Sequence, residues 1–148
     1  MYKISFIMLF LPTAAFAGFF GPSNFDECMV DKMKGQDPIM YSNVQKLCIN
    51  KFERELPNYA SKIKYEWGLG LFGLNITIKE NRGKYGLTKL YARFSEKPCK
   101  RSIEKDYSEE IKFDFNGHRL GSALAMEAPK INYQCIRIQR IFGVESPK

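Results

Sequence analysis

The four cysteines, and the segment that precedes them, constrain the fold of this 148-residue chain more than any other feature. Residues 1–17 carry one cation, Lys3, then an apolar run and the small-x-small end Ala15-Phe16-Ala17, which is typical of a secretory signal peptide. The apolar run is shorter than the roughly 20 residues of a membrane-spanning helix. We therefore expect cleavage after Ala17 rather than an anchor, with no transmembrane segment afterwards. An even number of cysteines behind such a signal predicts two disulfides in a periplasmic or secreted protein.

The mature chain, residues 18–148, is long enough to form one domain with its own core. Its first part, residues 18–56, has the pattern of two short helices. Ser23 is suited to cap the first helix, and Gly35 suits the left-handed position after its end. The apolar residues between them recur at spacings of three and four and form one stripe: Phe25, Cys28, Met29 and Met33.

A second helix follows, with two alternative starts. Asp37-Pro38 would give an N-cap followed by proline, and Ser42-x-x-Gln45 would give a capping box one turn later. We expect this helix to end near Glu55. Its stripe contains Cys48, and two short helices joined by a few residues run antiparallel, so Cys28 should pair with Cys48. The loop that this disulfide closes predicts a stabilisation of about 3 kcal/mol in the chain-entropy model.

The hairpin also carries a resemblance. The stretch D-E-C-M-V-D-K-M-K-G, followed by K-L-C-I-N-K-F, resembles a pattern in small, uncharacterised exported bacterial proteins. These have an acidic-x-Cys-aliphatic start, a Met-Lys-Gly end and a second cysteine, and they form a disulfide-stapled helical hairpin. The resemblance covers about residues 24–52. It implies a bacterial envelope origin and lends no catalytic residues.

From residue 57 onward the apolar pattern changes from a helical period to a period of two. Alternating segments occur near residues 63–67, 74–78, 90–94, 111–115 and 136–138, and a further strand is expected near 120–126. Asn116-Gly117 predicts a type I′ hairpin turn. Because strands do not alternate with helices, we expect an α+β protein with five or six antiparallel strands. They would form a meander, rolled or sandwich-like, on which the helical hairpin packs.

Cys99 and Cys135 would then form the second disulfide. The alternative pairings, Cys28 with Cys99 or with Cys135, remain open at this point. A zinc site is not expected, because the cysteines lack a C-x-x-C pair and the chain has one histidine. We expect no other metal and no cofactor.

The positive charge of the chain is concentrated in residues 79–105, which hold nine cations and three acids, whereas the segments on either side are balanced. If Leu90 and Phe94 face the core, Lys89, Tyr91 and Arg93 project from the opposite face. This stretch predicts a docking surface for an anionic lipid, a glycan or an acidic protein, although a merely solubilising surface explains it as well. Nucleic acid is not expected in an exported protein. The predicted contact residues are Lys79, Arg82, Lys84, Lys89, Tyr91, Arg93, Lys100 and Arg101.

The segment Trp67-Gly68-Leu69-Gly70-Leu71-Phe72-Gly73 is unusual because its glycines leave one strand face without side chains. We expect the helical hairpin to cover that face closely. The alternative is an open apolar groove for a partner or a lipid chain.

No catalytic residue is predicted. His118 stands beside a turn, and Ser122 lacks the flanking pattern of a nucleophile elbow. The acids Asp106, Glu109 and Glu110 are explained by ordinary loop and strand-edge positions. We therefore expect a non-enzymatic envelope binding protein. The alternatives are an inhibitor of an envelope-acting enzyme and a hydrolase that uses carboxylates near residues 106–114.

Overall fold

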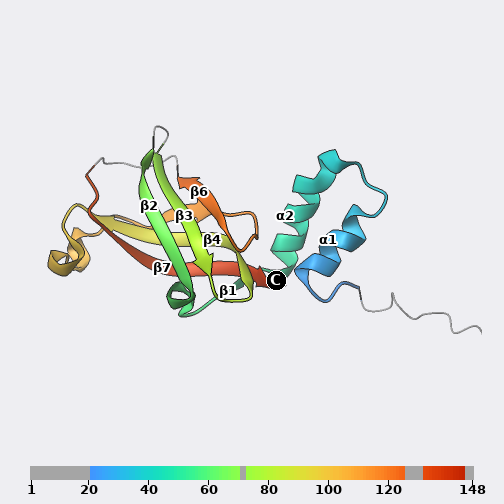
Figure 1. The fold of residues 1–148 in the computed structure, drawn as a ribbon, viewed down its shortest axis with the longest axis horizontal. Coiled ribbons are helices and arrows are strands. Elements are labelled where there is room, and N and C mark those ends of the chain that lie inside the picture. The colour runs from blue at the N-terminus through green and yellow to red at the C-terminus, as the bar shows by residue number, and fades with distance from the viewer. Residues whose placement is uncertain (1–20, 71–72, 126–131, 146–148) are drawn as a thin grey trace, which may run out of the picture.

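The computed structural model describes residues 21–70, 73–125 and 132–145. The expected signal peptide and its cleavage point lie outside these residues. Two helices come first, α1 (Phe25–Met33) and α2 (Tyr41–Phe52), and seven strands follow (Figure 1). The strands are β1 (Arg54–Glu55), β2 (Ile63–Gly70), β3 (Gly73–Asn81), β4 (Tyr85–Ser95), β5 (Ile111–Asp114), β6 (Gly121–Ala125) and β7 (Cys135–Glu145). Four 3-10 turns lie between them: η1 (Pro38–Met40), η2 (Tyr59–Lys62), η3 (Cys99–Arg101) and η4 (Glu104–Asp106).

The helical hairpin forms as the apolar stripes predict, with small changes at its ends. Asn24, not Ser23, caps α1, because its side chain accepts a hydrogen bond from the Glu27 N–H at 2.9 Å. Each of the two proposed starts of the second helix is partly correct. Asp37 caps the 3-10 turn η1, and α2 begins directly after it. Gly35 has the left-handed backbone that ends α1, with φ +75°.

The disulfide pairing predicted from the sequence is confirmed. Cys28 joins Cys48 with a Cα–Cα distance of 5.8 Å, and Cys99 joins Cys135 with 4.9 Å. The first bridge is buried in a small apolar cluster with Phe25 and Val44 of the hairpin and Val144 of β7. This cluster attaches the hairpin to the β portion.

The antiparallel strands form two sheets rather than one meander. One sheet has the order β1-β7-β4-β5 and the other β2-β3-β6, so sequence neighbours β3 and β4 belong to different sheets. The expected Asn116-Gly117 hairpin is wrong, because β5 pairs with β4 and β6 pairs with β3. Gly117 has positive φ and Asn116 does not, and the Gly117 N–H donates to the Leu87 carbonyl at 2.8 Å. The Asn-Gly turn therefore carries the chain from one sheet to the other.

The main core lies between the two sheets. Phe94 and Phe113 of the first sheet and Ile76 of the second are fully buried, as the alternating pattern predicts. Trp67 packs edge-on against Phe94, with ring centroids 5.5 Å apart. Each fully buried aromatic or aliphatic side chain contributes about 1.5–3 kcal/mol, so this cluster supplies most of the driving force for folding.

The helical hairpin stands at one end of the β portion, beside the C-terminal end of β7, and does not cover the glycine-rich strand (Figure 1). A methyl group built on Gly68 would have no neighbour within 4 Å, and one on Gly70 would meet only the Gly73 carbonyl at 3.8 Å. The expectation that the hairpin covers this face is wrong. The physical reason is that Phe25 and Ile49 of the hairpin pack beside Gly117 and Val144 at the end of the sheets instead.

Candidate binding surfaces

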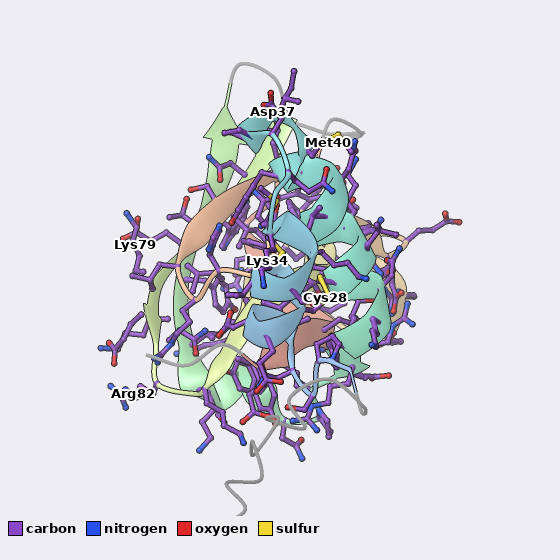
Figure 2. All side chains as sticks on the ribbon, turned by 90° about the vertical axis from the view of Figure 1, so that its right-hand side faces the viewer. Cys28, Lys34, Asp37, Met40, Lys79 and Arg82 are labelled. Carbon is purple, nitrogen blue, oxygen red and sulfur yellow. A yellow bond between two sulfur atoms is a disulfide. The ribbon has the colours of Figure 1, made fainter. Side chains whose placement is uncertain are left out.

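The residues predicted to contact an anionic partner do not form one hairpin. Lys79 lies on β3, which pairs with β2 and β6, whereas Lys89 and Arg93 lie on β4, which pairs with β5 and β7. Arg82 lies in the connection between these two sheets, and Figure 2 shows Lys79 and Arg82 on the side of the molecule away from α2. The expected continuous basic face is therefore divided between the two sheets.

Most of these cations already have carboxylate partners. Lys79 pairs with Glu66 at 3.0 Å, and four others pair at shorter range: Arg82 with Glu80, Lys84 with Glu145, Lys89 with Glu53, and Arg93 with Glu104. Exposed pairs of this kind add little to stability, but each one cancels much of the local positive potential. The hydrogen bond from Arg93 holds the pKa of the Glu104 carboxyl below its usual range, so this acid stays ionised and keeps neutralising its partner.

The outer face of β4 and β7 is packed rather than open. The Arg140 guanidinium lies 4.3 Å above the Tyr91 ring, and Tyr91 packs edge-on against Phe142 at 5.8 Å. The Lys89 ammonium and the Glu53 carboxylate form a partly enclosed pair, with side chains 30% and 14% exposed. Lys89 and Tyr91 thus have structural roles in the face that was predicted to bind a partner.

Unpaired cations gather instead in the segment of residues 97–106, which we call the basic loop. It contains η3 and η4 and carries Lys97, Lys100, Arg101 and Lys105. Lys97 donates to Asp106 at 2.6 Å, but no described carboxylate forms a salt bridge with the other three. Figure 1 shows this loop at the end of the molecule opposite the helical hairpin.

The basic loop is held in a fixed shape by several independent contacts. Cys99 is tied to β7 by its disulfide to Cys135. The Ser102 hydroxyl donates to the Lys97 and Pro98 carbonyls, at 3.0 and 3.1 Å. The backbone that carries Lys100, Arg101 and Lys105 is therefore already ordered. Binding a ligand would cost mainly the side-chain entropy of these three cations.

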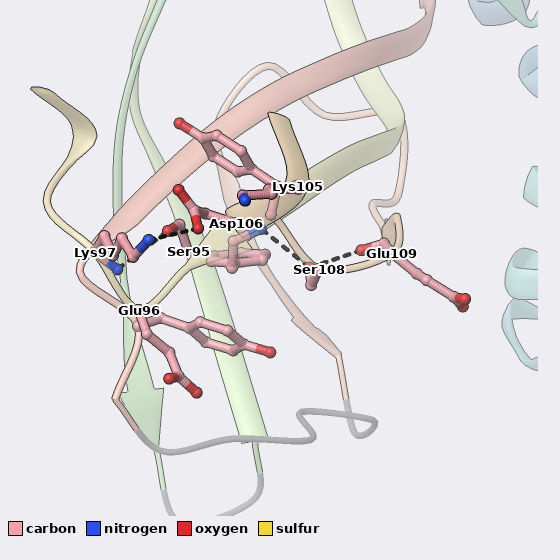
Figure 3. A pocket seen from close by; sticks show the side chains of 10 residues that line it. Ser95, Glu96, Lys97, Lys105, Asp106, Ser108 and Glu109 are labelled. Carbon is pink, nitrogen blue, oxygen red and sulfur yellow. Dashed lines mark hydrogen bonds and ion pairs between the residues drawn. The ribbon is translucent and has the colours of Figure 1, made fainter. Parts of the chain in front are cut away.

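A hollow of about 510 Å³ lies directly beside the basic loop. Its lining includes Tyr107 and Tyr133, and Figure 3 shows Lys97 facing Asp106, with Ser108 between Asp106 and Glu109. The Ser108 hydroxyl accepts from the Phe94 N–H at 3.1 Å and donates to the Glu109 carbonyl at 2.7 Å. This hydroxyl is engaged in backbone hydrogen bonds, and no side chain among the described residues forms a hydrogen bond with it that could activate it as a nucleophile.

Two of the carboxylates near residues 106–114, those of Asp106 and Glu110, are engaged in ion pairs. Asp106 accepts from the Ile103 N–H at 2.9 Å and pairs with Lys97, and both interactions lower the pKa of its carboxyl. A general acid requires the opposite shift. Glu110 pairs with Arg140 at 2.7 Å on the outer face of the sheet. Asp106 and Glu110 therefore both form ion pairs, and Asp106 also helps to close the basic loop.

His118 and Ser122, the other polar residues considered from the sequence, lie apart from the basic loop. His118 is exposed and lines a shallow hollow with Asp26, next to α1. Ser122 lies on β6, where its hydroxyl is 2.8 Å from that of Thr77 on the outer face of β3. Sequence alone gave no sign that His118 and Asp26 would share a hollow, because 91 residues separate them along the chain.

Comparison with models of protein families, with curated proteins and with solved structures finds no match for this chain. Among residues 21–70, 73–125 and 132–145, no helix is long and apolar enough to cross a membrane. The same residues contain no cluster of three His, Cys, Asp or Glu side chains placed to hold a metal ion. The geometry of the basic loop is therefore the main guide to function.

Proposed function

We propose that this protein is an exported, non-catalytic binding protein whose basic loop contacts an anionic component of the cell envelope. The observation that carries the proposal is the contrast between paired and unpaired cations. Lys79, Arg82 and Lys84 each face a carboxylate, whereas Lys100, Arg101 and Lys105 form no salt bridge with any described residue. An anionic ligand can gain charge-assisted contacts at the loop without first displacing an internal partner.

The hollow beside the loop supports the same proposal. Its aromatic walls and the cations near it suit a ligand that combines a negative charge with a ring or an acyl segment. Lys97, Lys105 and Asp106 all line the hollow, and the ion pair of Lys97 with Asp106, together with the hydrogen bond from the Ile103 N–H to Asp106, closes the basic loop. Because the interaction is mainly Coulombic, its strength should fall as salt screens charges over about 8–10 Å.

The test compares two triple variants with the same loss of charge. One variant changes Lys100→Gln, Arg101→Gln and Lys105→Gln in the basic loop, and the matched control changes Lys79→Gln, Arg82→Gln and Lys84→Gln. Each cation near an anionic surface contributes about 1 kcal/mol, so the loop variant should bind vesicles of phosphatidylglycerol, or an anionic polysaccharide, about 100-fold more weakly. The control should lose far less, and both variants should keep the wild-type melting temperature within a few degrees.

Binding is measured by co-sedimentation at low and at high salt. Equal weakening of both variants would mean that net charge alone matters and would overturn the role of the loop. A wild-type protein that shows no salt-sensitive association with either ligand would overturn the proposal as a whole.

A further inference from the structure

The tip of the helical hairpin exposes apolar side chains that the fold leaves uncovered. Ile39 is 81% exposed, Val30 74% and Leu47 63%, and Met40 and Tyr41 are exposed beside them. These are five of the nine large hydrophobic side chains that are exposed in the described chain, and all lie within residues 30–47. The turn between α1 and α2 points away from the β portion, and Figure 2 shows Asp37 and Met40 at its extremity.

The exposed side chains surround the tip and do not form one flat patch. At 100° per residue, Val30 stands about 200° around α1 from Cys28, and Leu47 stands about 100° around α2 from Cys48. The side chains of Val30 and Leu47 therefore point away from the Cys28–Cys48 disulfide, which lies where the two helices face each other. Ile39 lies in η1, between the helices. A single rigid partner covers one side of such a tip, whereas a lipid phase can cover all sides at once.

The depth of the apolar zone matches the interfacial region of a bilayer. A helix rises about 1.5 Å per residue, so Val30 lies about 4.5 Å from Met33 at the end of α1, and Leu47 lies about 10 Å along α2 from Met40. Amphipathic elements that lie in the membrane interface bury their apolar side chains by about 5–10 Å. Tyr41, with an apolar ring and a polar hydroxyl, is a residue type that favours this depth.

The charges around the tip also fit a lipid interface. Asp37 is used as a cap and accepts from the Ile39 N–H at 2.9 Å, and Asp31 pairs with Lys32 at 3.6 Å. Lys34 and Lys46 form no salt bridge with a described residue, so their ammonium groups are available to lipid headgroups. Long lysine side chains can keep the charge at headgroup level while their methylenes lie along apolar surface.

From these observations we infer that the helical hairpin tip inserts into the interfacial region of a lipid bilayer, with Ile39 deepest. Residues 30–47 carry a net charge of +1, because they contain three lysines and two aspartates. Its binding is therefore hydrophobic and persists at high salt, unlike that of the basic loop at the other end of the molecule. The two surfaces are thus separable by experiment.

The test places a fluorescent reporter at each end of the protein purified after export. Ile39→Trp reports on the tip and Ile103→Trp on the basic loop, and Trp67 in β2 gives the same background in both. The vesicles contain equal parts of phosphatidylcholine and phosphatidylglycerol with brominated acyl chains. We expect the Ile39→Trp emission to shift to the blue and to be quenched at low and high salt, and the Ile103→Trp emission not to be quenched.

A second pair of variants tests whether the apolar side chains drive the insertion. Ile39→Ser with Leu47→Ser should lower partitioning at least about tenfold, because each such side chain, once buried, contributes more than that factor. The matched control, Leu120→Ser with Leu124→Ser, removes two exposed apolar side chains from the β portion and should leave partitioning unchanged. All four positions are exposed, so folding should be retained in both variants.

Three outcomes would overturn the inference. The first is vesicle binding without quenching of the Ile39→Trp emission, which would assign the binding to another surface. The second is the absence of vesicle binding at high salt. The third is a lipid-free dimer that Ile39→Ser dissociates, which would mean that a second copy of the chain covers the tip.

Discussion

The two ends of this molecule are each closed by one disulfide, but they are attached to the sheets in different ways. At the helix end, Cys28 and Cys48 are both buried and pack with Val144 of β7. At the loop end, Cys99 is exposed and only Cys135 is buried. Apolar packing therefore holds the helical hairpin, whereas hydrogen bonds and a covalent link hold the basic loop. The way in which each segment is attached decides how it should respond to mutation, reduction and acid.

The largest effect is expected at the backbone contact that supports the helix end. A methyl group on Gly86 would lie 1.6 Å from the Gly117 carbonyl oxygen, and neither backbone can move without breaking the Gly117–Leu87 hydrogen bond. Gly86→Val should therefore lower the free energy of unfolding by more than about 3 kcal/mol, through overpacking against backbone. Urea denaturation measures the loss.

The matched control is Gly68→Ala on β2, where the added methyl group would have no neighbour within 4 Å. It should change the free energy of unfolding by less than about 1 kcal/mol. A Gly86→Val variant as stable as wild type would mean that the helix end is not held by close contact between β4 and the Asn116-Gly117 turn.

The next effect comes from removing each disulfide separately by paired Cys→Ala substitutions. The chain-entropy model gives about 3 kcal/mol for Cys28–Cys48 and about 4 kcal/mol for Cys99–Cys135, because the second closes the longer loop. The two variants should lose similar amounts of unfolding free energy, but different segments of the molecule should open. Loss of Cys28–Cys48 should reduce the helical circular dichroism and open residues 25–52 to proteases while the Trp67 environment is kept.

Loss of Cys99–Cys135 should leave the helical signal intact and raise hydrogen exchange in residues 97–106. Loss of signal at both ends in either variant would contradict the separation of the two attachments. It would indicate that the domain unfolds as one cooperative unit.

The smallest effect is a stronger response to acid at the basic loop than at the helix end. At the basic loop, hydrogen bonding from the Ile103 N–H and then from Lys97 lowers the pKa of the Asp106 carboxyl below 3.8. The stabilisation that this carboxylate provides is complete above pH 3.8 and is lost as the pH falls through the folded-state pKa. At the helix end, the two acids of the first turn of α1 oppose each other: burial raises the pKa of Asp26 above 3.8, whereas hydrogen bonds from Ser23 lower the pKa of Glu27 below 4.5, so their contributions to the pH dependence have opposite signs.

Below about pH 3.8, exchange in residues 97–106 should therefore rise on acidification by more than exchange in α1. Hydrogen exchange followed by mass spectrometry measures both segments in one sample, and Asp106→Asn serves as the control, because it should remove the pH dependence at the loop only. Acid-induced opening that begins in α1 would reverse the assignment.

The amino-acid sequence by itself indicated the helices and most of the strands, and it favoured the observed disulfide pairing while leaving the other pairings open. The stripe that contains Phe25 and Cys28 places the first helix, and the Asp37-Pro38 and Ser42 signals bracket the start of the second. The alternation around Ile76, Leu90 and Phe113 places the strands, because side-chain periodicity is a local property of the backbone. The same local signals brought Cys28 opposite Cys48, and the remaining two cysteines then paired with each other.

Only the tertiary structure decided how the strands pair, where the hairpin lies and which cations are free. The separation of β3 from β4 depends on contacts between residues far apart in sequence, such as Ile78 with Gly121, which no local pattern encodes. Lys84 is neutralised by Glu145, 61 residues away, whereas Lys100 lies within the same basic stretch and has no described salt-bridge partner. The sequence located the positive charge correctly but could not tell cancelled charge from available charge, because ion pairing depends on distance in space and not along the chain.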